Sequence, residues 1–487
     1  MKKNILKIAA LLLGIVLICG CGGASASSES KDSSGKKETK AGTSVSVSVK
    51  ETLSDDDIPD KTVTSFTIPD GTKVISYEAF EDCTNLAEIV IPDSVTKIET
   101  GAFIYCTSLK KVKLSAGLTE MGNSVFEGCT ALEEVTIPEG AKTVGNWAFL
   151  YCSSIKEITI PGTVDTVGEA AFSGCTNLTK VTVKDGVKHI DRNCFYDCNN
   201  LTEVWIGDTV ETLWSELFKK LPKLTSLHLP DSLTSIPNYL CKECTAIESI
   251  NIPSKAQEIG AYAFQDCTGL KSVSIPGSVK NIFGGAFAGC TNLTTVEFSE
   301  GLEKIERQAF ADSGIVEISL PESLKVIDEE VFYKCASLKK VKFPSKMESI
   351  GIYAFKYCES LEEAILPEGL TELDVFGGCT SLKNVKLPAG LKSVSGFDGT
   401  AIETIELPAG LESIPMGAFS GCINLKEIKI PDTVTNLGSA VFRGCTALEK
   451  IYVSQKTLDA TGLKLTRSTG EFYQWLKVES TTQGELY

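Results

Sequence analysis

Cysteine is the residue type with the most chemistry to offer in this chain, because eighteen cysteines occur beside only two histidines, His189 and His228. Cysteines can form disulfides, hold zinc or exchange electrons, and histidines are the usual general bases. The segment Cys241-Lys-Glu-Cys244 has the spacing of a redox pair. It lacks a neighbouring βαβ pattern and a second ligand pair with zinc spacing, so we expect neither a redox centre nor a metal site there.

Fourteen of the cysteines occupy one position of an internal repeat. Six of them follow one another at intervals of 23 residues, at positions 83, 106, 129, 152, 175 and 198. A phenylalanine precedes most of them by three residues, and a leucine or isoleucine follows by three. A cysteine framed in this way behaves as a small apolar core residue, so we expect buried free thiols. Disulfides between neighbouring coils are the alternative in an exported protein, but strands about 4.8 Å apart do not bring Cβ atoms to the ~3.8 Å that a disulfide needs.

Each unit of the repeat predicts a short strand that ends in a turn. In the second unit, Ile89 and Ile91 alternate with Glu88 and Val90, which is the period of a strand with one buried face. Pro92 has no N–H to donate to a ladder, so the strand ends there. A second short apolar segment and an Ala-Phe-x-x-Cys piece complete the unit. One unit cannot bury its apolar side alone, whereas stacked units form a continuous core.

The pattern Leu-x-x-Val-x-Ile-Pro, Val-x-x-Ile and Ala-Phe-x-x-Cys-x-x-Leu resembles the BspA-like leucine-rich repeat over residues 61–453. The resemblance implies an α/β solenoid, a right-handed superhelix of about 17 coils of 23 residues with a parallel β-sheet on one face. It also implies a bacterial surface protein, since several members act in adhesion to host or neighbouring-cell proteins. The chain departs from the pattern at Cys241 and Leu221 and in the shortened units that end at Cys379, Thr400 and Cys422.

Residues 1–20 have the features of a signal peptide. Two lysines precede an apolar stretch of about 12 residues, which is too short for the roughly 20 of a membrane-spanning helix. The segment 18–21, Ile-Cys-Gly-Cys, resembles the lipobox of bacterial lipoproteins, which implies that Cys21 carries the lipid and becomes the mature N-terminus. Cys19 is the rival position, and a plain secretory signal or an uncleaved anchor is the other alternative. We therefore expect an exported protein, lipid-anchored at the bacterial cell membrane or outer surface.

Two further segments flank the repeat. Residues 21–60 are rich in serine, glycine and lysine and predict a flexible tether. Within them, valines alternate at 45, 47 and 49, where a short strand is the alternative to a flexible tether, and Asp55-Asp56-Asp57 has the composition of a solvated charge run. Residues 454–487 leave the period and contain three aromatic residues; we expect a C-terminal cap, with a small separate binding element as the alternative.

The best candidate for binding is the outward face of the predicted sheet, because the residue between the last two apolar positions of each strand points to solvent. Trp205 and His228 are neighbours in this series, where the adjacent residues are small and polar, and a large exposed aromatic is a typical interface anchor. The alternative to a binding role is that the tryptophan only covers a flat sheet. We predict Trp205, His228, Thr182, Glu203 and Asn251 as ligand-binding residues. The full outward series is Thr67, Val90, Lys113, Thr136, Thr159, Thr182, Trp205, His228, Asn251, Ser274, Glu297, Ser319, Lys342, Ile365, Lys386, Glu406, Lys429 and Tyr452.

Composition and motifs narrow the class of function. The formal charge of −16 argues against nucleic-acid partners and against electrostatic docking on anionic lipid. The sequence contains no Gly-x-Ser-x-Gly elbow, His-Glu-x-x-His pair or Walker loop, so we expect no catalysis, cofactor or metal. We predict a cell-surface, lipid-anchored protein that binds proteins of the host matrix or of neighbouring cells, in adhesion or as an interaction scaffold. The alternative is a lipoprotein that captures a peptide or glycan.

Overall fold

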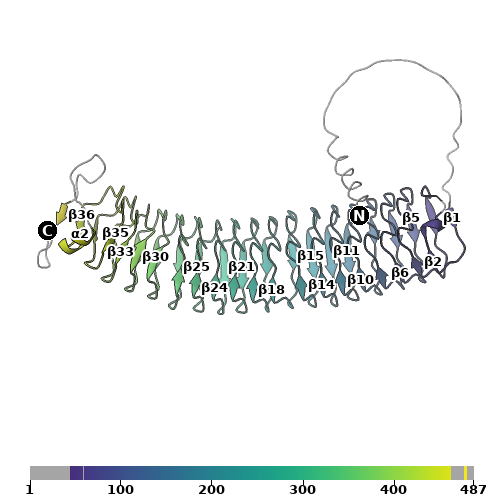
Figure 1. Cartoon of the computed structure of the whole chain (residues 1–487), viewed down its shortest axis with the longest axis horizontal. Helices are drawn as coiled ribbons and strands as arrows, with labels where there is room; N and C mark the ends of the chain where they lie inside the picture. Colours follow the sequence, from purple (N-terminus) through teal and green to yellow (C-terminus); the bar gives the residue numbers. More distant parts are fainter. Residues whose placement is uncertain (1–43, 59, 462–476, 480–487) are drawn as a thin grey trace, which may run out of the picture. The chain divides into compact units, whose positions relative to one another are not determined.

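The structure, a computed structural model, describes residues 44–58, 60–461 and 477–479. In this part the chain winds into a parallel-stranded solenoid of about 17 turns of about 23 residues, as predicted (Figure 1). Residues 1–20, which we predict as a signal peptide, Cys21 and the first part of the predicted tether lie outside the described residues.

The longer strands form the front ladder, in which neighbouring strands pair in parallel and in register within five successive sheets that end at β9, β17, β23, β31 and β37. Side chains alternate between core and solvent along these strands where the structure describes them; in β11 the pattern is exposed, buried, exposed, buried. All eighteen outward positions of the sequence analysis are exposed or half-exposed. The strands are β1 (Ser44–Ser46), β3 (Ser65–Thr67), β5 (Glu88–Val90), β7 (Lys111–Lys113), β9 (Glu134–Val135), β11 (Glu157–Ile160), β13 (Lys180–Val183), β15 (Glu203–Ile206), β17 (Ser226–His228), β19 (Ser249–Asn251), β21 (Ser272–Ile275), β23 (Thr295–Phe298), β25 (Glu317–Ser319), β27 (Lys340–Lys342), β29 (Glu363–Ile365), β31 (Asn384–Lys386), β34 (Glu427–Lys429), β36 (Lys450–Tyr452) and β37 (Lys477–Glu479).

A second set of short strands forms the back ladder, which the expectation of a sheet on one face did not include. In each coil the Val-x-x-Ile segment supplies this strand, and the Ala-Phe-x-x-Cys piece is a series of turns, so the coils hold strands and turns where an α/β repeat would hold helices. These strands also pair in parallel, within three successive sheets that run from β2 to β16, from β18 to β28 and from β30 to β35. They are β2 (Thr52–Leu53), β4 (Val74–Ile75), β6 (Lys97–Ile98), β8 (Glu120–Met121), β10 (Thr143–Val144), β12 (Thr166–Val167), β14 (His189–Ile190), β16 (Thr212–Leu213), β18 (Ser235–Ile236), β20 (Glu258–Ile259), β22 (Asn281–Ile282), β24 (Lys304–Ile305), β26 (Val326–Ile327), β28 (Ser349–Ile350), β30 (Glu372–Asp374), β32 (Ser393–Ser395), β33 (Ser413–Ile414) and β35 (Asn436–Leu437).

A column of stacked phenylalanine rings runs through the core. From Phe80 to Phe218 the ring centroids of successive coils lie 4.9–6.0 Å apart and the rings are nearly parallel. Cys241 interrupts the column, and the stack resumes at Phe264. Each ring packs on the rings of the two adjacent coils, so each coil is stabilised by its nearest neighbours.

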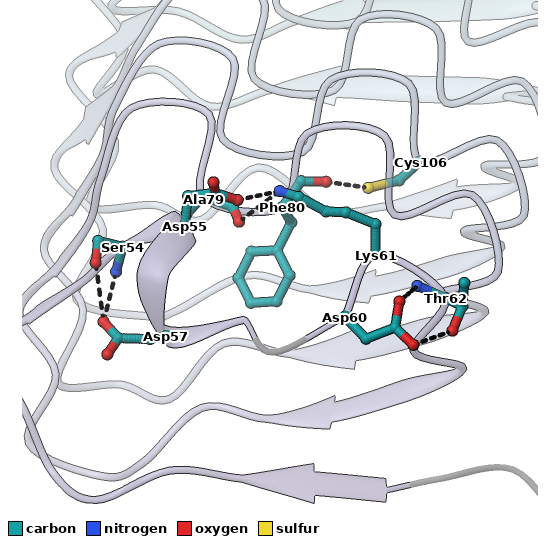
Figure 2. Close-up of polar contacts among 9 residues, drawn as sticks. All are labelled: Ser54, Asp55, Asp57, Asp60, Lys61, Thr62, Ala79, Phe80 and Cys106. Carbon is teal, nitrogen blue, oxygen red and sulfur yellow. Dashed lines mark hydrogen bonds and ion pairs between the residues drawn. The ribbon is translucent and has the colours of Figure 1, made fainter.

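The repeat cysteines hold the turns of successive coils together. The Cys106 thiol donates a hydrogen bond to the carbonyl of Phe80 in the preceding coil at 3.2 Å (Figure 2), and the same contact recurs along the column. The sixteen cysteines among the described residues are free thiols, and all but Cys445 are buried. Burial raises the pKa of Cys83 and Cys198 to about 12, which makes such thiols poor nucleophiles. Cys241 lies in the phenylalanine position and is equally buried, so the Cys-x-x-Cys spacing follows from the repeat.

The exception at Cys445 gives a testable difference in reactivity. The neighbouring Cys422 thiol lowers the pKa of Cys445, so at a given pH more of Cys445 is thiolate than of Cys198 or Cys267, whose pKa burial raises. In native protein treated with iodoacetamide at mildly alkaline pH, we expect peptide mapping to show Cys445 alkylated at least about 100-fold faster than the mid-array thiols, which need local opening. Equal rates at Cys267 and Cys445 would contradict the burial of the column; unfolded protein provides the control in which all sites react alike.

The N-terminal end of the array begins earlier than the sequence boundary at residue 61. β1 pairs with β3 and β2 pairs with β4, so residues 44–53, which were assigned to the tether, continue both ladders. The 3-10 helix η1 (Asp55–Asp57) follows. The expectation of a solvated charge run is wrong for Asp57, which is 8% exposed, accepts hydrogen bonds from the backbone N–H and hydroxyl of Ser54 at 2.9 and 3.0 Å (Figure 2) and pairs with Lys50.

Charge pairs complete this end of the solenoid. The hydrogen bond from Lys50 holds the pKa of Asp57 below its ordinary value. Lys61 pairs with Asp55 and lies 3.5 Å from the carbonyl oxygen of Ala79 in the next coil (Figure 2). The first coil is thus fixed by side chains to the coil that follows it.

After β36 the chain leaves the repeat. The helix α2 (Gln455–Thr461) follows, and its buried Thr457 donates a hydrogen bond to the carbonyl of Pro431 at 3.5 Å. β37 then pairs in parallel with β36 and continues the front ladder. The assignment of residues 454–487 as a cap stays a prediction, because most of this segment lies outside the described residues.

Candidate functional site

Register in the front ladder brings the two central residues of the predicted site together. Thr182 pairs with Trp205, and Trp205 pairs with His228, across β13, β15 and β17. The residues that flank Trp205 in its strand, Val204 and Ile206, are buried, so the indole must point away from the core. Parallel in-register strands therefore place these three side chains in one outward column.

Trp205 and His228 stack face to face. Their ring centroids lie 3.8 Å apart and their planes differ by 11°. Trp205 is 49% exposed, which is high for a tryptophan, while the imidazole beneath it is partly covered. Stacking on His228 restricts the indole rotamers, so a partner would find the aromatic surface already ordered.

The imidazole also approaches a carboxylate that sequence reasoning missed. Nε2 of His228 lies 3.6 Å from Oδ1 of Asp208, which is beyond a normal hydrogen bond. The same Oδ1 accepts the backbone N–H of Asp231 at 3.0 Å, which fixes the carboxylate. Nε2 is itself buried and has no hydrogen-bond partner among the described residues. Asp208 follows Gly207, which replaces the proline that usually ends the strand. This departure from the repeat is the feature of the sequence that points to an unusual chain path near His228.

The remaining predicted residues lie in different surroundings. Glu203 forms an ion pair with Lys180 at 2.9 Å on the outward face beside Trp205, and this carboxylate raises the pKa of Lys180. Thr182 adjoins Trp205 on the side away from His228. Asn251 belongs to β19, which begins a separate sheet, so it is not in hydrogen-bonded register with His228. The structure therefore groups four of the five residues and places the fifth across a break in the ladder.

The outward strand positions immediately on the C-terminal side of the aromatic pair carry no carboxylate or ammonium group, while Glu248 and Lys271, just before β19 and β21, form an ion pair at 2.7 Å. The outward positions of β17, β19 and β21 carry only serine, histidine and asparagine. Charged outward residues return at Glu297 in β23. The aromatic pair thus lies between the Lys180–Glu203 ion pair and a neutral polar strip, a composition close to that of protein-binding surfaces, which have an aromatic centre and a polar surround.

Cysteine, aspartate and glutamate side chains, which can bind metal ions, are numerous among the described residues. Among them, no group of three or more histidine, cysteine, aspartate or glutamate side chains is placed to hold a metal ion. In the same residues we find no helix with the length and apolarity needed to cross a membrane. What the front ladder presents is a wide, ordered contact surface.

The fold and this surface define a leucine-rich-repeat protein. The profile of the BspA type leucine-rich repeat region (6 copies) matches residues 59–179, 142–271, 257–375 and 372–462. These matches cover well over half of the sequence, so the chain belongs to the BspA-type leucine-rich-repeat family, as its motifs predicted. Leucine-rich repeats of this kind are typically non-catalytic scaffolds.

The chain is also similar to several solved structures. A leucine-rich repeat protein from Bacteroides ovatus is 25% identical, with 84% of this chain and 88% of that chain covered and a TM-score of 0.46. A leucine rich cell surface protein from Faecalibacterium prausnitzii is 22% identical over 84% and 91% of the two chains, with a TM-score of 0.29. The pneumococcal vaccine antigen PcpA is 19% identical over 82% and 79%, with a TM-score of 0.34. Among curated proteins, no relative matches the chain.

Proposed function

We propose that this protein is a surface-displayed scaffold that binds other proteins through the front ladder, with Trp205 and His228 at the centre of contact. The observation that carries the proposal is the half-exposed tryptophan stacked on a histidine in a column of outward side chains. An ordered aromatic surface loses little conformational entropy on binding and is the commonest kind of interface anchor. Its partners are proteins of the host matrix or of neighbouring cells, which it contacts in adhesion.

Substitution of the aromatic pair tests this proposal. Binding of the full-length protein to immobilised matrix proteins and to intact neighbouring cells is measured by surface plasmon resonance and by cell attachment. We expect Trp205→Ala to weaken the tightest interaction by about 2 kcal/mol, roughly 30-fold, because it removes the exposed anchor. His228→Ala should weaken it by about tenfold, because the indole then loses its support.

Two exposed apolar residues serve as matched controls. Trp214 is 53% exposed beside the back ladder, and Ile365 is 66% exposed in a distant part of the front ladder. Alanine at either position should leave binding unchanged. Full binding by Trp205→Ala, or an equal loss in Trp214→Ala, would contradict a contact centred on Trp205.

We infer that the scaffold is held at the cell surface by a lipid on Cys21, a residue outside the described range. The lipobox-like segment 18–21 supports this assignment. We expect Cys21→Ser to move the protein from the membrane fraction to the soluble fraction, because acyl chains contribute about 0.8 kcal/mol per buried methylene and the thioether can no longer form. Cys19→Ser is the matched control and should stay in the membrane fraction. A Cys21→Ser protein that remains membrane-bound would contradict the anchor.

A further inference from the structure

A hollow on the opposite side of the solenoid, at the back ladder, is not used by the proposed function. It is an open surface depression of about 470 Å³ among the coils of β4, β6, β8 and β10. Its principal lining residues are Tyr77, Lys97, Glu99, Glu120, Gly122 and Thr143.

At the hollow, one outward column of the back ladder changes from a carboxylate to glycine. Lys97, Glu120 and Thr143 lie in register in the back ladder, and two residues further on in each coil stand Glu99, then a glycine, then a second glycine. A Cβ on Gly122 would lie 2.8 Å from the backbone nitrogen of Thr100, so the coils approach too closely there for any larger residue. Gly122 therefore contributes only backbone atoms to the lining, beside the polar and aromatic groups named above.

The polar groups at the hollow retain hydrogen-bonding capacity. Nζ of Lys97 lies 3.6 Å from a carboxylate oxygen of Glu99 and 3.5 Å from one of Glu120, which is longer than a direct hydrogen bond. A strong donor and two strong acceptors therefore stand side by side, next to the hydroxyl of Thr143. Vicinal hydroxyl groups, each of which can donate and accept, match such an array.

An aromatic ring borders the same space. Tyr77 is 58% exposed, and its backbone N–H donates to the second carboxylate oxygen of Glu99 at 3.2 Å, which ties the tyrosine to the polar array. The phenol ring offers an apolar surface against which the C–H face of a sugar ring can pack. The combination of a ring and neighbouring charged hydrogen-bonding groups suits a pyranose better than a purely apolar ligand, because carboxylates in the lining would lose hydration without replacement.

Two other ligand classes fit the hollow less well. The lining carries two carboxylates and one ammonium in a chain of formal charge −16, so an anionic ligand is disfavoured. An extended peptide would need free backbone groups at a strand edge, but β4, β6, β8 and β10 are each paired on both sides. We propose that this hollow is a binding site for a neutral saccharide, with its ring on Tyr77 and its hydroxyls on Lys97, Glu99 and Glu120.

The test uses the full-length protein and a defined set of methyl glycosides. Methyl glucoside, methyl galactoside, methyl mannoside and methyl N-acetylglucosaminide are compared with methyl glucuronide by saturation-transfer difference NMR and by titration. We expect at least one neutral glycoside to bind with a Kd of about 1 mM, and the glucuronide to bind about tenfold more weakly. Absence of binding by every neutral glycoside at about 10 mM, or a preference for the glucuronide, would overturn the proposal.

Substitutions at the hollow test whether the glycoside binds there. Tyr77→Ala and Glu120→Gln should each weaken the glycoside at least tenfold, Tyr77→Phe should keep most of the affinity because the ring remains, and Tyr196→Ala, a tyrosine of similar exposure elsewhere, should have no effect. Thermal melting checks that each variant is folded. Binding that survives both Tyr77→Ala and Glu120→Gln overturns the site. Trp205→Ala should bind the glycoside normally, so this experiment and the test of the front ladder can fail independently.

Discussion

Replacement of Phe149 by alanine is expected to lower the free energy of unfolding by about 3–5 kcal/mol. The ring is fully buried and stacks between Phe126 and Phe172, with centroids 5.4 and 5.3 Å away. Removing it leaves a cavity, and it also removes two aromatic contacts worth about 0.5–1.5 kcal/mol each. The backbone carbonyl that accepts the Cys175 thiol remains, so the loss is confined to packing. Urea denaturation followed by circular dichroism measures the change.

The Phe149→Ala variant should also be destabilised locally, in the coils next to the substitution. Each coil contacts only its neighbours, so the coils of Phe126 and Phe172 should show faster amide exchange, while the coil of Phe419 should exchange as in the wild type. Tyr196→Ala, at an exposed tyrosine, serves as the control and should change stability by less than about 0.5 kcal/mol. A uniform rise in exchange along the whole array would contradict nearest-neighbour stacking.

Much of this architecture can be predicted from the sequence, because residues separated by one repeat period are neighbours in adjacent coils. A separation of 23 residues is enough to place Trp205 beside His228 and Phe149 between two other rings, whatever the details of the turns. Successive residues of a strand point to opposite faces of the sheet, so the sequence predicts which residues point outward. The exposed positions of the front ladder agree with this prediction. Buried free thiols likewise follow from their place between phenylalanine and leucine.

Features that depend on turn geometry could not be predicted in the same way. Two apolar residues three positions apart, such as Val95 and Ile98, fit a turn or a strand equally well, so the back ladder was not expected. The approach of Asp208 to His228 depends on the path of the chain after Gly207, and the break between β17 and β19 has no sequence period of its own. Asp57 is different, since Ser54-x-x-Asp57 has the form of a capping box and that signal was available.

Replacement of Gly145 by alanine is expected to destabilise the array by about 3 kcal/mol. An added Cβ would lie 2.1 Å from the carbonyl oxygen of Gly122 and 2.4 Å from its carbonyl carbon, both backbone atoms of the preceding coil. No side-chain rotation can relieve such a contact, so the two coils must separate and strain the pairing of β8 with β10. Gly145 does not have a positive φ, so backbone strain in an alanine does not explain the expected destabilisation. The destabilisation comes from the close approach of the two backbones.

Gly410 provides the matched control for this substitution. A Cβ there would meet only the flexible end of Lys392, at 3.9 Å, and the backbone has no positive φ. Gly410→Ala should therefore be neutral or stabilise by about 0.4–1 kcal/mol, through a less flexible unfolded chain. Urea denaturation of both variants measures the contrast, and equal stabilities would show that the coils can separate freely at Gly145. Because coupling runs through neighbouring coils, Gly145→Ala should leave protein binding at Trp205, several coils away on the other ladder, unchanged.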